Sequence, residues 1–175
     1  MKFNLLSILS ALILALSGIS ATRALELAAS TDPIRVQADR AQLDEASGKA
    51  TYSGHVVVTQ GEARLEAETV ILYRDAQGVS RVEAHGQPAY LRQIAPGDTV
   101  ATEAWGETLV YSRDTQTLEL LRGARLKQGT NVFRGNTIHY NTRTRVVDAR
   151  FDENTGTGRV EMIITPANKE APAKP

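Results

Sequence analysis

The amino-acid sequence predicts an all-β domain assembled from similar units. Apolar and polar residues alternate with a period of two through most of residues 33–165, the pattern of strands with one buried and one solvated face. Turn signals separate these runs, as at Gln60-Gly61, Gln77-Gly78 and Gln128-Gly129. The same segment contains no sustained helical stripe of apolar residues beside a polar face.

A glycine-led strand recurs four times along the chain. The copies begin at Gly54, Gly86, Gly123 and Gly158, so they are 32, 37 and 35 residues apart. A period of this size predicts stacked supersecondary units that bury their apolar faces against one another. We expect each of these glycines to enter a turn that the strand then follows. The repeat favours a scaffold that builds a surface or groove over a pocket built around one reactive residue.

A second repeated element alternates with the first. It occurs at Ala67–Tyr73, Gly106–Tyr111 and Gly135–Tyr140, with a weaker copy at Ala38–Leu43. Each of the three stronger copies is a small residue, a polar residue and a strand that ends in an aromatic residue. The small residue predicts a bend or a close backbone approach at a corner of the sheet. Each unit is then strand, corner, strand and turn, which favours a β-sandwich, a jelly roll or a β-roll.

The N-terminus has the pattern of a secretion signal. Lys2 supplies the positive charge, Leu5 to Leu16 is apolar, and Thr22-Arg23-Ala24 places small residues at the positions before a cleavage site. We therefore expect residues 1–24 to be a cleaved signal peptide. An uncleaved N-terminal anchor remains the alternative.

The rest of the chain divides into three parts. Residues 25–32 are expected to be a short leader, residues 33–165 one folded domain, and residues 166–175 a disordered tail. The tail contains no large apolar residue, so it cannot bury enough surface to offset the entropy of ordering.

Composition excludes several classes of function. The chain has no cysteine, so we expect packing alone, without disulfides, to hold the exported domain together. It contains 20 basic and 20 acidic residues, and removal of residues 1–24 leaves 18 basic and 20 acidic ones. A nearly neutral chain with few aromatic residues argues against nucleic acid as a partner.

The sequence also lacks the patterns of a catalytic centre. His55, His85 and His139 are far apart and have no cysteine beside them, so they have no metal-ligand spacing. No glycine-rich phosphate loop or nucleophile elbow occurs in the chain. We therefore expect no enzyme activity, no metal site and no cofactor. An exported enzyme whose site the sequence does not reveal is one functional hypothesis. The other two are described below.

The first and last strands are expected to leave open edges. Unpaired strands template pairing with another chain, and a head-to-tail contact of this kind produces filaments rather than closed rings. The alternative is that Pro33, a bulge or the tail blunts these edges. The expected edge residues are Ile34, Arg35, Val36, Gln37, Val160, Glu161, Met162, Ile163 and Ile164.

Three segments together resemble one known family. They are Asp32 to Asp44 with its proline-led strand, Tyr52 to Gly61 with the pattern Gly-x-Val-x-Val-x-Gln, and Ala67-Glu-Thr-Val70. In this order and spacing they resemble the OstA-like (LptA) family of periplasmic lipopolysaccharide-transport proteins. The resemblance covers roughly residues 32–140.

The resemblance implies a β-jellyroll of two antiparallel sheets that form an open V-shaped groove. In this family the groove carries the acyl chains of lipid A, and copies join head to tail in the periplasm. The implied partners are lipopolysaccharide, further copies of the chain, and the jellyroll domains of inner-membrane LptC-like and outer-membrane LptD-like proteins. The groove residues expected on this basis are Ile34, Val36, Val56, Val58, Leu65, Leu91, Tyr111, Leu126 and Phe133.

From the residues alone, two alternatives stay open. The same inward residues form a closed dry core as readily as a lipid groove. A purely structural periplasmic scaffold that assembles through its edge strands is therefore the second hypothesis. The candidates for contact with headgroup phosphates, which solvated outer faces explain equally well, are Arg35, Arg74, Arg81, Arg92, Arg113 and Arg122.

Overall fold

The computed structural model describes residues 32–94, 99–151 and 158–165. The expected signal peptide, all of the expected leader except Asp32, and the expected tail lie outside these residues. The described part consists of ten β-strands and contains no helix. The strands are β1 (Arg35–Gln37), β2 (Arg40–Asp44), β3 (Lys49–Gln60), β4 (Ala63–Asp75), β5 (Gly78–Gln93), β6 (Thr102–Ser112), β7 (Thr117–Gln128), β8 (Asn131–Asn141), β9 (Val146–Arg150) and β10 (Glu161–Ile163).

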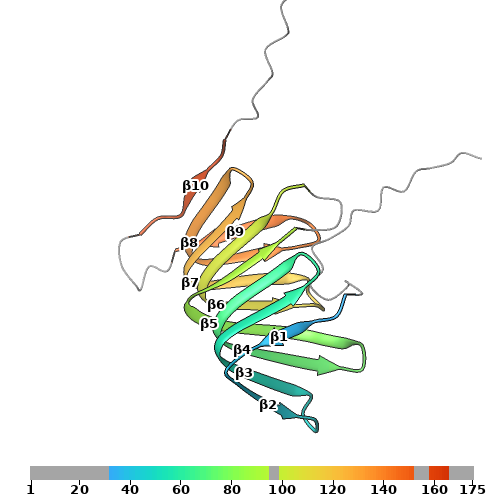
Figure 1. Cartoon of the computed structure of the whole chain (residues 1–175). Helices are drawn as coiled ribbons and strands as arrows, with labels where there is room; N and C mark the ends of the chain where they lie inside the picture. Colours follow the sequence, from blue (N-terminus) through green and yellow to red (C-terminus); the bar gives the residue numbers. More distant parts are fainter. Residues whose placement is uncertain (1–31, 95–98, 152–157, 166–175) are drawn as a thin grey trace, which may run out of the picture.

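All ten strands belong to one antiparallel sheet in which β3 to β8 follow one another in sequence order. Both ends of the sheet are interrupted strands. β1 pairs with the second half of β3 and β2 with its first half, whereas β10 and β9 pair with the two halves of β8. Figure 1 shows that β1 and β2 lie at one end of the stack and β8 to β10 at the other.

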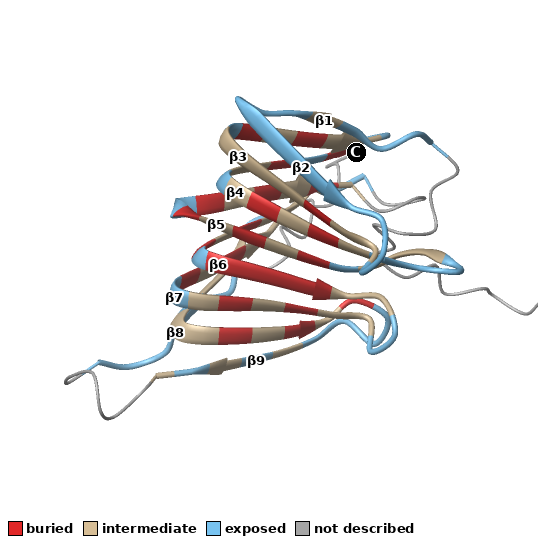
Figure 2. Ribbon diagram, turned by 90° about the horizontal axis from the view of Figure 1, so that it is seen from below, coloured by how far each residue is buried: buried red, intermediate tan, exposed pale blue. Residues whose placement is uncertain are grey.

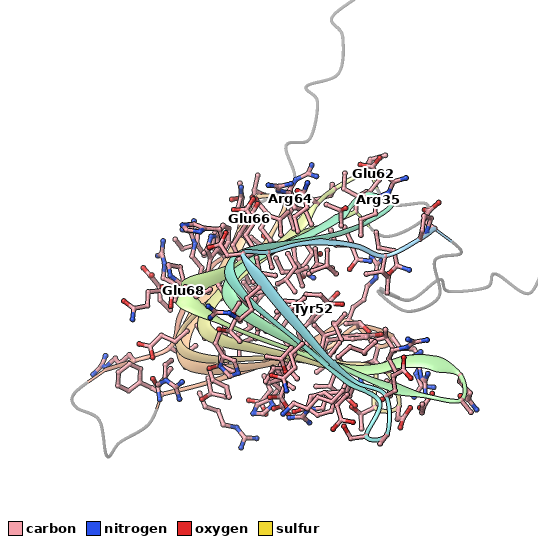
Figure 3. All side chains as sticks on the ribbon, turned by 60° about the horizontal axis from the view of Figure 1, so that its bottom comes forward. Arg35, Tyr52, Glu62, Arg64, Glu66 and Glu68 are labelled. Carbon is pink, nitrogen blue, oxygen red and sulfur yellow. The ribbon has the colours of Figure 1, made fainter. Side chains whose placement is uncertain are left out.

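Every long strand from β3 to β7 bends in its middle. Register shifts interrupt the pairing at Ser53/Val56, Glu66/Thr69, His85/Ala89, Trp105/Thr108 and Leu121/Ala124. Such shifts mark β-bulges, which bend a strand and increase its twist. Because the bends line up from strand to strand, the sheet folds into two arms that diverge from one vertex, as Figure 3 shows. The two sheets expected from the family resemblance are therefore the halves of one continuous sheet.

The expected role of the repeat glycines is wrong in one respect. Gly54, Gly86 and Gly123 lie inside β3, β5 and β7 at the bends rather than at turns. Gly158 precedes β10 outside any strand. The corner prediction for the second element is confirmed, since Gly106 lies at a register shift and a Cβ on Gly135 would come within 2.8 Å of the Arg150 carbonyl oxygen.

The core lies between the arms, in three apolar rows that cross the whole sheet by direct pairing. We call the half of the sheet that contains β2 and β9 the β2–β9 arm, and the other half the β1–β10 arm. The first row is Leu43, Ala50, Leu72, Val82, Tyr111, Leu118, Tyr140 and Val147. The second row is Ala41, Tyr52, Val70, Ala84, Leu109, Leu120, Ile138 and Ala149. The third row, on the β1–β10 arm, is Val36, Val58, Leu65, Leu91, Ala104, Leu126, Phe133 and Met162.

Burial falls towards both ends of these rows. The middle members are buried, as the red bands on β4 to β8 in Figure 2 show. The end members are not, because Leu43 is 58% exposed and Met162 is 51% exposed. Burying a leucine or methionine side chain contributes about 1.5–3 kcal/mol, so each end of the sheet leaves stabilisation unrealised in the single chain.

The bend at Gly54 generates the first prediction. Gly54 has φ +80°, and a Cβ there would lie 2.8 Å or less from three side-chain atoms of Asp39. Gly123 also has a positive φ, +63°, but has open space around its Cβ position. We expect Gly54→Ala to lower the free energy of unfolding by more than Gly123→Ala, which itself costs about 1 kcal/mol. Equal midpoints in urea unfolding of the two variants would contradict this account of the bend.

Candidate functional site

The inner faces of the two arms enclose an apolar cleft that opens to solvent. Its empty volume is about 440 Å³. The lining residues come from both arms and are Ile34, Val58, Gln60, Ala63, Arg64, Leu65, Leu72, Val79, Val82, Leu91 and Tyr111. A second hollow of about 220 Å³ shares Leu65, Val82, Leu91 and Tyr111 with the first and extends it to Leu109 and Leu118. The cleft therefore runs along the first and third apolar rows.

The chemistry of this cleft is that of a non-polar binding surface. Gln60 and Arg64 are the polar residues that border it, and the Arg64 guanidinium turns to the outer face, where it pairs with Glu66. Among the described residues, no group of three or more His, Cys, Asp or Glu side chains is placed to hold a metal ion. Within the same residues no helix is long and apolar enough to cross a membrane. What the arrangement offers is apolar contact over an extended surface.

Five of the nine residues expected in a groove line this cleft. They are Ile34, Val58, Leu65, Leu91 and Tyr111. The other four lie on the same inner face but do not line the cleft. Val56 and Leu126 are fully buried, whereas Val36 and Phe133 are partly buried and pack against the core.

Four apolar residues that line the cleft were not among the expected groove residues: Ala63, Leu72, Val79 and Val82. The inward–outward alternation of side chains is interrupted between Val79 and Arg81, because the β4–β5 register shifts between Tyr73 and Arg74. Val79 and Val82 therefore both reach the cleft although an odd number of steps separates them. Alternation does place Leu72 on the inner face, but it does not distinguish a groove residue from a core residue.

Exposed large hydrophobic residues gather at the two ends of the sheet. Of the eight in the described part of the chain, all but Val100 lie on an edge strand or within two residues of one. They are Ile34, Leu43, Val146, Val160, Met162, Ile163 and Ile164. An apolar edge with unpaired backbone groups is a surface on which another strand adds.

The structure places the nine expected edge residues as follows. Arg35, Val36 and Gln37 form β1, and Glu161, Met162 and Ile163 form β10. Ile34, Val160 and Ile164 directly flank these strands, which are shorter than expected. Sequence reasoning missed the other half of each edge, β2 and β9.

An ion-pair cluster ties two turns together at the tip of the β2–β9 arm. The Arg113 guanidinium donates to both carboxylate oxygens of Asp75 and to the Val79 carbonyl oxygen. The hydrogen bonds from Arg113 hold the pKa of Asp75 below its usual range. This cluster fixes the hairpin that carries Val79 to the mouth of the cleft.

Several arginines considered for headgroup contact already have carboxylate partners. Arg81 donates to Glu83 at 2.7 Å, Arg122 donates to Glu107 at 2.7 Å, and Arg113 is held by Asp75. On the outer face Arg64 donates to Glu66 at 2.6 Å, and Figure 3 shows Glu66 on the outside of the V, whereas Tyr52 lies between the arms.

Comparison with known proteins identifies the family. The sequence model of the family described as "LptA/(LptD N-terminal domain) LPS transport protein" matches residues 35–146. The chain belongs to this family. That description is of a transport protein rather than an enzyme.

Individual relatives agree with the family assignment. The lipopolysaccharide export system protein LptH of Pseudomonas aeruginosa is 39% identical over 144 residues, which are 78% of this chain and 81% of LptH. The lipopolysaccharide export system protein LptA of Escherichia coli K12 is 27% identical over 171 residues, 95% of this chain and 90% of LptA. The crystal structure of LptH, described as the periplasmic component of the lipopolysaccharide transport device, superposes with a TM-score of 0.70 at 38% identity over 79% of this chain and 99% of LptH.

The Asp75–Arg113 pair generates a prediction about this LptA-family chain. A carboxylate whose pKa is lowered by folding stabilises the fold at pH values above its pKa in the unfolded chain. This contribution is lost as the pH falls through its pKa in the folded protein. We expect Asp75→Asn to lower the free energy of unfolding at pH 7, with the difference from wild type vanishing at acidic pH. The comparison variant is Asp114→Asn, which removes the longer 3.3 Å pair of the same guanidinium with a carboxylate that is 74% exposed, and its effect should be smaller. A constant difference between wild type and Asp75→Asn across the pH range would contradict this role.

Proposed function

We propose that this protein is a periplasmic carrier that passes lipopolysaccharide from the inner to the outer membrane along an apolar groove. The observation that carries the proposal is the solvent-open cleft between the arms, whose apolar rows run uninterrupted from one open edge of the sheet to the other. Membership of the lipopolysaccharide-transport family supports the substrate class and the periplasmic location.

The cleft fits acyl chains by its chemistry. Each buried methylene group contributes about 0.8 kcal/mol, so a chain that packs against the third row is bound without any polar contact. The cleft of one copy is lined by eleven residues, and a lipid with several chains needs a longer apolar surface. A groove that continues into a second copy supplies that surface.

The strand directions allow the sheet to continue. β1 and β2 run antiparallel to β3, β9 and β10 run antiparallel to β8, and six strands separate the two edges. The two edges therefore run in opposite directions, so the first edge of one copy can pair antiparallel with the last edge of the next. Joined this way, every apolar row continues across the junction, and the contact is head to tail.

The rows also define the register of this junction. Met162 ends the third row at one edge and Val36 ends it at the other, while Val147 and Leu43 end the first row. Continuity of the rows places Met162 opposite Val36 of the next copy, and Val147 opposite its Leu43. The inner-membrane LptC-like and outer-membrane LptD-like jellyroll domains would dock at the two terminal edges in the same way.

A purely structural scaffold is the competing function. It would use the same two edges but would carry no lipid in the cleft. Only lipid contact between the arms separates the two functions, which decides the first experiment.

We expect a photoreactive amino acid at Leu91 or Tyr111 to form an adduct with lipopolysaccharide in cells that synthesise it, because both side chains line the cleft. The matched control is Glu66, on the outer face. Adducts at both inner positions and none at Glu66 are expected, read by immunoblotting for lipopolysaccharide. If the protein is folded and exported but forms no adduct at either inner position, the carrier function is refuted and the scaffold function is retained.

The register generates a second test, which the absence of cysteine makes straightforward. We expect the double variant Val36→Cys/Met162→Cys to form disulfide-linked multimers under mild oxidation. β1 and β10 lie at opposite ends of the sheet, so a bond within one copy is excluded. The control is Gln37→Cys/Met162→Cys, in which the side chains leave opposite faces of the sheet. Equal multimer yields from the two variants on a non-reducing gel would refute the proposed register.

A further inference from the structure

A row of polar side chains accompanies the third apolar row at the mouth of the cleft. Its members stand two residues from the apolar residues of the same strands, and they are Gln60, Gln93, Thr102, Gln128 and Asn131. Gln93 pairs with Thr102, Thr102 with Gln128, and Gln128 with Asn131. We call these five residues the amide row, although Thr102 carries a hydroxyl. Because side chains two residues apart share a face, the amide row lies on the inner face, about 7 Å nearer the strand ends than the apolar row.

Gln93 differs from the other members of the amide row. The residue is only 5% exposed, and its Oε1 has no hydrogen-bond partner among the described residues. By contrast, the Gln60 amide donates to the Asp32 carbonyl oxygen at 3.1 Å, and Asn131 Oδ1 accepts from the Thr165 N–H. A buried acceptor without a partner destabilises the fold, so its presence on the inner face requires an explanation.

The place of Gln93 indicates what would satisfy it. Leu91, on the same face of β5, lines the cleft, and so does Ala63 on the neighbouring strand β4. A chain that enters between the arms, past the amide row, and ends against the third apolar row would thus have its outer end beside the Gln93 amide. The Oε1 atom accepts a hydrogen bond, so the complementary group is an O–H or N–H donor close to the apolar part of the ligand.

We propose that Gln93 selects lipids whose acyl chains carry a hydroxyl or amide N–H donor near the headgroup. This inference rests on the proposed function, since it concerns a lipid in the same cleft. The apolar row takes the methylene chain, and the amide row takes the polar groups where the chain joins the headgroup. Gln93 thereby sets the depth to which a chain enters as well as the kind of chain that fits.

The test uses two synthetic glycolipids with a phosphorylated sugar and two ester-linked tetradecanoyl chains, which differ only in a 3-hydroxyl group on each chain. Binding to the full chain is measured by isothermal titration calorimetry. Wild type is expected to bind the hydroxylated probe roughly 3- to 10-fold more tightly than the plain probe, because one neutral hydrogen bond usually changes affinity by about that factor. Gln93→Leu, of similar size, is expected to abolish this preference while keeping its affinity for the plain probe.

The control variant is Gln77→Leu in the exposed turn between β4 and β5, which should keep the preference. Thermal unfolding verifies that each variant is folded, and removal of an unpartnered buried amide should not lower the melting temperature of Gln93→Leu. If wild type binds both probes equally, or if Gln93→Leu keeps the preference, the role of Gln93 is refuted while the carrier function stands. If wild type binds neither probe, both proposals fail.

Discussion

The bend shared by the long strands is the constraint on which the rest of the structure depends. A flat sheet of this size would expose one apolar face to water, whereas a sheet bent along a single line buries that face against itself. The bulges at Gly54, Gly86, Gly106 and Gly123 provide the bend, and their alignment turns one sheet into two arms. The cleft, its apolar lining and the two open edges are all consequences of this one geometry.

The same constraint explains why the molecule is incomplete at both ends. Only a closed barrel removes the edges of a sheet, whereas a bent open sheet leaves its first and last strands unpaired on one side. The interruption of the first edge at Ala38 and Asp39 faces the bulge at Gly54 and His55 of β3, so the edge follows the bend. Both edges thus keep the two-arm shape, so a second copy that pairs as proposed would meet both arms at once.

Sequence reasoning predicted the strands and their inward residues because alternation reports directly which face of a strand is buried. It misplaced the repeat glycines because a bend inside a strand and a turn between strands require the same backbone. Gly54 and Gly123 inside strands have φ of +80° and +63°, and Gly61 and Gly129 in turns have +53° and +59°. Nor could alternation distinguish a dry core from a cleft, because Leu65 and Leu91 point inward in either case and only the angle between the arms decides.

The central claim is that the sheet continues from one copy into the next through both edges. Amide hydrogen exchange of the full chain, compared between low and high protein concentration, tests it most directly. The account predicts that protection rises together in β1, β2, β9 and β10, while the central strand β5 exchanges equally slowly at both concentrations. Oligomers that form without added protection at these four strands would contradict it.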